Sequence, residues 1–280
     1  MGLLSGLDQF GLGNLENEDL YEKKKVAQAP SVTDTKATKE QTEAECIFDK
    51  SYTCPVCDKD IKVKTVKVGK AKLIATDMDL RPKYDKLDTI KYDIIACPHC
   101  GYASLSRYFG SLSVQQTRLI KEKVSKNFKS LPEKKIYSYD DALERYKLAL
   151  ANAIVRHGKA SEKAYICLKM AWLVRGKMEE LDQNDPDYQT NLKQRKTDEA
   201  EMLKSSLEGF MTARQSEDFP MCGMDETTVD YLIAVTAMKF ERFDLAEKMI
   251  SGILVSPGAN SRMKDKTRDL RDMLKELKHK

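Results

Sequence analysis

The C-terminal part of the chain carries the hydrophobic spacing of amphipathic helices. From about residue 112 onward, apolar residues recur every three to four positions, the period of an α-helix with one buried face. Prolines stand between these segments, where a helix break costs little. The pattern predicts helices near residues 113–129, 139–156, 160–182, 190–214, 226–241, 243–255 and 261–278.

The segment before residue 110 has strand-like patterns instead. IKVKTVKV at residues 61–68 alternates apolar and polar side chains, and the slip at Thr65-Val66 predicts a bulge. CIFDKSYTC (46–54) and TIKYDIIAC (89–97) contain many β-branched and aromatic residues, and each predicted strand runs into a cysteine pair. We therefore predict an α+β protein in which a small β unit precedes an all-α array.

Residues 1–45 are polar except near their start. QAPSVTDTKATKEQTEAE has almost no apolar content, so it cannot offset its ordering entropy and predicts a disordered tail. The alternative is a short motif that folds onto a partner groove. It rests on the apolar residues Leu3, Leu4, Leu7, Phe10, Leu12 and Leu15.

Two predicted helices carry a repeat signal. Ala142, Tyr146, Ala149 and Leu150 follow an A-x-x-x-Y-x-x-A-L spacing, and residues 243–254 hold nearly the same frame. The spacing resembles the second helix of a tetratricopeptide repeat, where small residues let helices approach closely. The repeat's first-helix marks are mostly missing, so an ordinary helical bundle stays an alternative.

Composition and charge narrow the classes of function. Hydrophobic content is 41%, charged content is 33% and net charge is only +4, which gives no strong indication of nucleic-acid binding. No apolar run approaches the roughly 20 residues of a membrane helix. The start MGLLSGLDQFGLGNL matches neither a secretory signal nor a myristoylation site. We expect a cytoplasmic protein with no membrane partner.

The strongest chemical signal is the pair of stretches CPVC and CPHCG. They place Cys54, Cys57, Cys97 and Cys100 in two C-x-x-C turns, and each such turn lets both sulfurs face one point. Four thiolates suit tetrahedral zinc and leave no open position, so we predict a structural zinc site in a zinc-ribbon-like unit. Iron in the same geometry and a redox dithiol pair are the less favoured alternatives.

The remaining candidate ligands have structural interpretations. His99 is expected to face outward from its turn, and Cys46 to be a half-buried strand residue. Cys167 reads as helix core, and Cys222 lies in a loop without a clear role. Because the cysteine count is seven and no export signal is found, a disulfide framework is not expected.

Several polar and aromatic residues also have structural interpretations. Trp172 is expected to pack in the helical core, and Arg175 to serve a groove or a surface pair. The acid pairs Asp140-Asp141 and Glu179-Glu180 suit a helix N-terminus and a solvated face. A solvated strand face is favoured over a phosphate-contacting one for Lys59, Lys62, Lys64, Lys67, Lys70 and Lys72.

The sequence contains no nucleophile elbow, P-loop, dinucleotide fingerprint or H-E-x-x-H motif. We therefore predict no enzyme and no catalytic residues. The favoured function is a zinc-binding adaptor that engages a protein or peptide partner through its helical array. A nucleic-acid-associated zinc-ribbon protein is the alternative, and an enzyme or redox protein ranks third.

The chain resembles the bacterial domain-of-unknown-function family 2225 over roughly residues 46–255. The resemblance rests on DKSYTCPVC, KYDIIACPHCGYASLSRYF, EKAYICLKMAWLVR and YLIAVTAMKFERFDLAEKMI. It implies a zinc-ribbon-like segment with tetratricopeptide-like helices, no established activity and the same four cysteine ligands. Asp58 stands where glycine is usual. The predicted domains are a tail at 1–45, a zinc-ribbon-like domain at 46–110 and a tetratricopeptide-like domain at 111–280.

Overall fold

The structure is a computed structural model that describes residues 42–110, 112–130 and 132–278. The predicted tail and its apolar motif lie outside these ranges, except for its last residues. Those residues belong to a short helix, α1 (Glu43–Cys46). Glu43 is anchored, because its carboxylate accepts a hydrogen bond from Tyr92 Oη at 2.7 Å and pairs with Lys91 Nζ at 2.7 Å. The described fold therefore begins slightly before residue 46.

The N-terminal part is built from three separate antiparallel hairpins. The first pairs β1 (Ile47–Thr53) with β2 (Asp60–Val66), and the second pairs β3 (Leu73–Thr76) with β4 (Pro82–Tyr84). The third pairs β5 (Ile94–Ala96) with β6 (Ala103–Leu105). Short 3-10 helices flank it: η3 (Thr89–Tyr92) and η4 (Ser106–Tyr108).

Two sequence expectations about this part were wrong. The register of β1 and β2 runs without a shift from Thr53↔Asp60 to Ile47↔Val66, so the slip at Thr65-Val66 is no bulge. TIKYDIIAC is strand only in its second half. Its first half is η3, because the Asp88 side chain accepts a hydrogen bond from Ile90 N at 2.9 Å and caps the turn.

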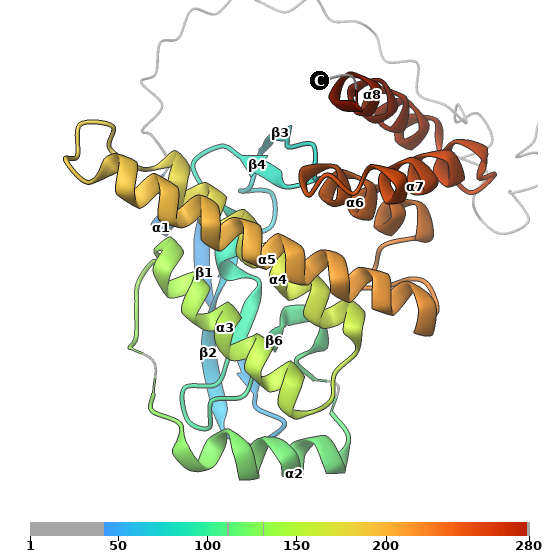
Figure 1. The fold of residues 1–280 in the computed structure, drawn as a ribbon. Coiled ribbons are helices and arrows are strands. Elements are labelled where there is room, and N and C mark those ends of the chain that lie inside the picture. Colours follow the sequence, from blue (N-terminus) through green and yellow to red (C-terminus); the bar gives the residue numbers. More distant parts are fainter. Residues whose placement is uncertain (1–41, 111, 131, 279–280) are drawn as a thin grey trace, which may run out of the picture. The chain divides into compact units, whose positions relative to one another are not determined.

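The C-terminal part is helical, as the spacing predicted. Its elements are α2 (Val114–Lys123), η5 (Ser125–Asn127), α3 (Tyr139–Val155), α4 (Ala160–Glu179), α5 (Tyr188–Ser216), α6 (Glu226–Lys239), α7 (Phe243–Val255) and α8 (Ser261–Lys278). Successive helices α3 to α8 pack on one another, and α4 and α5 lie along each other (Figure 1). The protein is thus α+β, with hairpins followed by a mainly helical region. The tetratricopeptide character of that region stays a prediction.

The residues of the repeat spacing face the interior. Ala142, Tyr146 and Ala149 on α3 are buried, as are Ala246 and Ile250 on α7. Small alanine side chains at these positions let neighbouring helices approach closely, and this is why the spacing indicates paired helices. No helix in the described ranges combines the length and the apolarity needed to cross a membrane.

One hydrophobic core joins the third hairpin to the helices. Ile90, Ile94 and Leu105 are buried in the same cluster as the inner faces of α3, α4 and α6. Tyr146 on α3 is fully buried and donates its hydroxyl hydrogen to Ile90 O at 3.1 Å. The predicted domain boundary near residue 110 stays a prediction. A core that both parts share disfavours their independent folding.

A charged network fixes the loop after β3 to the helices. Arg175 on α4 pairs with Asp79 at 2.7 Å and with Glu199 on α5 at 2.7 Å. Trp172, which packs in the core as expected, donates from Nε1 to Asp79 Oδ2 at 2.9 Å. Arg175 therefore forms partly buried ion pairs and also lines a groove of the helical region.

Candidate metal centre

Each C-x-x-C stretch forms the turn of one hairpin. Cys54 follows β1, and the turn returns to β2 at the pair Thr53↔Asp60. Cys97 follows β5, and the turn returns to β6 at the pair Ala96↔Ala103. The strands that the sequence placed before each cysteine pair thus position both turns.

The two turns share one backbone pattern. In the first, Cys54 N donates to Lys59 O at 2.9 Å, and in the second, Cys97 N donates to Tyr102 O at 2.8 Å. In both turns the residue after the second cysteine donates its N–H back to the first cysteine's carbonyl, at 2.9 and 3.1 Å. The repeated geometry brings each pair of sulfurs to one side of its turn.

Both turns close through a left-handed residue. Gly101 has φ 74° and Asp58 has φ 58°. Glycine adopts this conformation without steric cost, and aspartate is among the few other residues that visit it. Asp58 therefore closes the first turn as Gly101 closes the second, and the two turns share one geometry.

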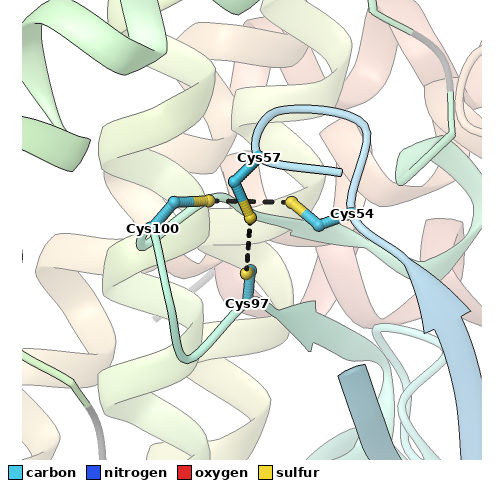
Figure 2. Close-up of side chains that lie close together, drawn as sticks. All are labelled: Cys54, Cys57, Cys97 and Cys100. Carbon is cyan, nitrogen blue, oxygen red and sulfur yellow. Dashed lines mark hydrogen bonds between the residues drawn. The ribbon is translucent and has the colours of Figure 1, made fainter. Parts of the chain in front are cut away.

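The four cysteine sulfurs come together in one cluster (Figure 2). Cys54 and Cys100 sulfurs lie 3.6 Å apart, those of Cys57 and Cys97 lie 3.7 Å apart, and all four are within 4.8 Å of one another. A tetrahedral metal with sulfur ligands at about 2.3 Å requires sulfur–sulfur edges of about 3.8 Å. The donor set and spacing therefore fit a single four-thiolate metal ion.

Contacts among the sulfurs shift the pKa values of Cys54, Cys97 and Cys100 in different directions. Hydrogen bonds from the Cys100 and Cys54 thiols lower the pKa of Cys97, and backbone N–H groups of His99 and Cys100 lower it further. The contacts with Cys54 and Cys97, together with burial, raise the pKa of Cys100. Without a metal ion the cluster therefore favours a thiolate at Cys97 and thiols at Cys54 and Cys100. A bound metal ion would require the deprotonated form of all four cysteines.

A hydrophobic shell surrounds the cluster. Cys54, Cys97 and Cys100 are buried, and Cys57 is half-buried. The shell comes from the hairpins, the segment after β6 and α2, and consists of Val56, Ile61, Val63, Ile95, Tyr102, Phe109 and Ile120. Exclusion of water by such a shell strengthens metal–thiolate bonds and protects the sulfurs from exchange.

Two residues from outside the hairpins hold the second turn. Asn152 on α3 is fully buried and donates from Nδ2 to Gly101 O at 2.9 Å. The Phe128 ring packs so closely on Gly101 that an added Cβ would lie 2.5 Å from it. Neither contact was predicted from the sequence. The available signal for Asn152 was a polar residue on the same helical face as Tyr146 and Ala149.

The other candidate ligands lie apart from the cluster. His99 is exposed, and Cys167 is buried on α4, as predicted. Cys222 is buried within its loop. The expectation for Cys46 was wrong, because it ends α1 rather than lying in a strand and is 3% exposed. Its side chain packs with Ile47 in a separate small cluster.

The predicted lysine face is largely solvated. Lys59, Lys62, Lys70 and Lys72 are exposed. Lys64 pairs with Asp49 at 2.7 Å.

Both acid pairs lie where they were predicted. Asp140 and Asp141 stand in the first turn of α3, and Glu179 and Glu180 are exposed. The two Glu179 oxygens also accept hydrogen bonds from Arg81 at 3.0 and 3.1 Å.

The fold and the cluster define a class of protein in which hairpins carry a four-cysteine metal-binding cluster and join a helical region. Residues 47–274 match the family model described as an uncharacterized protein conserved in bacteria, DUF2225, and the chain belongs to this family. No curated protein and no solved structure matches the chain.

Proposed function

We propose that this protein is a non-enzymatic adaptor whose structural zinc site stabilises the hairpins and whose helical array binds a protein partner. Zinc is the favoured ion because four thiolates complete its tetrahedral shell. A filled shell leaves no position for a substrate, so the metal's contribution is to folding.

The observation that carries the proposal is an apolar groove in the helical region. Its volume is about 720 Å³. Its apolar lining comes from α5, α6, α7, α8 and the loop after β3, and consists of Met78, Leu203, Val235, Met238, Phe243, Met273 and Leu277. Three of these side chains remain open to solvent, at 44% for Met78, 40% for Met273 and 42% for Leu277.

The groove suits the apolar face of an amphipathic helix. Met273 and Leu277 are one helical turn apart on α8, so they present a row of side chains parallel to a bound helix. Methionines at both rims can adapt their shape to different side chains. Glu241 is an exposed charged residue of the lining and offers a partner for the polar side of such a helix, whereas Lys239 is paired with Glu199 at 3.1 Å.

The test is an affinity pull-down with the full chain and nuclease treatment. Met273→Glu and Leu277→Glu place charge in the groove at exposed positions, so the fold should persist. Ile154→Glu is the matched control, since Ile154 is 56% exposed on α3 and lies outside the groove lining. We expect one protein partner with the wild type and the control, and its loss with both groove variants.

Partner recovery that is equal for all variants would contradict the groove as the binding site. Complete absence of a nuclease-resistant protein partner would contradict the adaptor function itself.

A further inference from the structure

A second, smaller cleft lies beside the metal cluster and has a different chemistry. It has a volume of about 390 Å³ and is bounded by β2, the second cysteine turn, residues 132–137 and α3. Five of its lining residues are basic and two are acidic. The basic residues are Lys62, Lys64, Lys134, Lys135 and Arg145. This excess of positive charge points to an anionic ligand.

Arg145 is the residue that makes the cleft more than a group of surface lysines. It is only 8% exposed, and its guanidinium lies 3.9 Å from the centre of the Tyr137 ring. Tyr137 in turn stacks on Tyr92 with ring centres 5.2 Å apart. The stack fixes the plane of the guanidinium and leaves its edge as the polar surface available to a ligand.

The donors of Arg145 are mostly unused within the described residues. Nη1 donates to Asp141 O at 3.3 Å, and no carboxylate in the described ranges forms an ion pair with the guanidinium. The Asp141 carboxylate is engaged elsewhere, because Oδ2 accepts hydrogen bonds from Ser138 N at 3.0 Å and Ser138 Oγ at 2.8 Å. The Asp141 carboxylate acts on the guanidinium through its charge, but no hydrogen bond joins the two groups within the described residues. A nearly buried guanidinium with unused donors favours a bound anion.

The acidic residues of the cleft do not cancel its charge. Asp49 pairs with Lys64 at 2.7 Å, which neutralises that lysine. Lys134 lies 3.8 Å from the Asp141 carboxylate. Lys62, Lys135 and the Arg145 guanidinium then face Glu133 as the single remaining acidic residue of the lining. Lys62 and Lys135 are exposed at its rim, where they can attract an anion and contact it as point charges.

We propose that this cleft binds the phosphate group of a small phosphate monoester, with Arg145 as the bidentate contact. The volume lies within the about 300–1,000 Å³ range of small-molecule sites and exceeds the need of a bare ion. Tyr137 is the single aromatic residue of the lining, and Arg145 and Tyr92 occupy its faces. No open ring therefore remains for a nucleobase, and a sugar phosphate is the ligand class that fits.

The first test is calorimetric titration of the full chain with glucose 6-phosphate, with glucose as the uncharged comparison. Arg145→Lys keeps the charge but removes the planar fork, and we expect it to weaken binding about 10-fold or more. Lys62→Gln with Lys135→Gln should weaken binding severalfold and reduce its salt dependence. We expect glucose not to bind.

Two exposed lysines outside the cleft provide a matched control. Lys70→Gln with Lys72→Gln removes two exposed charges outside the cleft, and binding should be unchanged. Equal losses in the rim and control variants would overturn the site, as would unchanged binding by Arg145→Lys. The rim variants decide the question if Arg145→Lys fails to fold. Binding of a short single-stranded RNA without binding of glucose 6-phosphate would also overturn the proposal and assign the surface to nucleic acid.

Discussion

Asn152→Ala separates the role of the metal centre from that of the helical core. The side chain is fully buried on α3, and its Nδ2 donates to Gly101 O at 2.9 Å and to Leu148 O at 2.9 Å. The first bond is the polar link between the helices and the second cysteine turn. Alanine removes it and leaves the carbonyl oxygen of Gly101 without its buried donor.

The expected change in unfolding free energy for Asn152→Ala is the sum of opposing contributions. An unsatisfied buried carbonyl costs about 1–3 kcal/mol. Against this, Asn152 Oδ1 has no partner within the described residues, so its removal ends a desolvation cost. Alanine also favours the helix by about 0.5 kcal/mol. We therefore expect a net loss of about 1 kcal/mol in unfolding free energy.

The effect on the metal should be larger than this modest destabilisation suggests. Partners that orient a ligand typically contribute 10- to 100-fold in metal affinity. Asn152 holds the residue next to Cys100, so we expect a loss of about 10-fold. Competition with a chromophoric chelator measures the affinity, and denaturant unfolding measures the stability.

Lys147→Ala is the control for this experiment, since Lys147 is exposed on the same helix. It should change neither quantity beyond a small gain from helix propensity. A folded Asn152→Ala protein with the metal affinity of the wild type would refute the reasoning that the helix supports the turn.

Three further predictions test the core, the turn and the charged network. Cys97→Ser should abolish tight metal binding, and the shared core predicts that helical circular dichroism falls in the same transition; retained helicity would support two independent domains. Gly101→Ala should cost about 1–2 kcal/mol or more in denaturant unfolding, because alanine is strained at φ 74° and its Cβ would meet Phe128. Burial raises the pKa of Asp79, but hydrogen bonds and charge from Arg175 outweigh it and leave that pKa below its usual value. The ionised Asp79 carboxylate thus stabilises the fold above about pH 4, and this stabilisation is lost as the pH falls further. Asp79→Asn should therefore make the unfolding free energy depend less on pH in the acid range. An unchanged pH dependence would contradict the role given to the Asp79–Arg175 pair.

The sequence predicted the helices well because their hydrophobic period is regular. The last two predicted helices, 243–255 and 261–278, match α7 and α8 residue for residue. The strand prediction for TIKYDIIAC was wrong in its first half. It rested on the β-branched composition and did not consider Asp88, which caps the 3-10 helix there. The break in the apolar–polar alternation at Thr65-Val66 marks the end of β2, where the alternation of buried and exposed side chains stops.

The candidate metal cluster was predictable because its spacing is local. In each turn two residues separate the cysteines, and strands lie on either side of each turn. This pattern is enough to predict that four sulfurs meet. Asn152, the Arg145 cleft and the apolar groove were not predictable in the same way. Each joins residues that are distant along the chain, such as Lys62 and Arg145, and no local pattern encodes that proximity.

We propose that the four cysteines hold one structural zinc ion. The most direct measurement is elemental analysis of the purified full chain, combined with a titration of its reactive thiols. We predict one zinc per chain and protection of Cys54, Cys57, Cys97 and Cys100 from thiol reagents until a chelator is added. Bound iron, or folded protein without metal whose four thiols react at once, would contradict it.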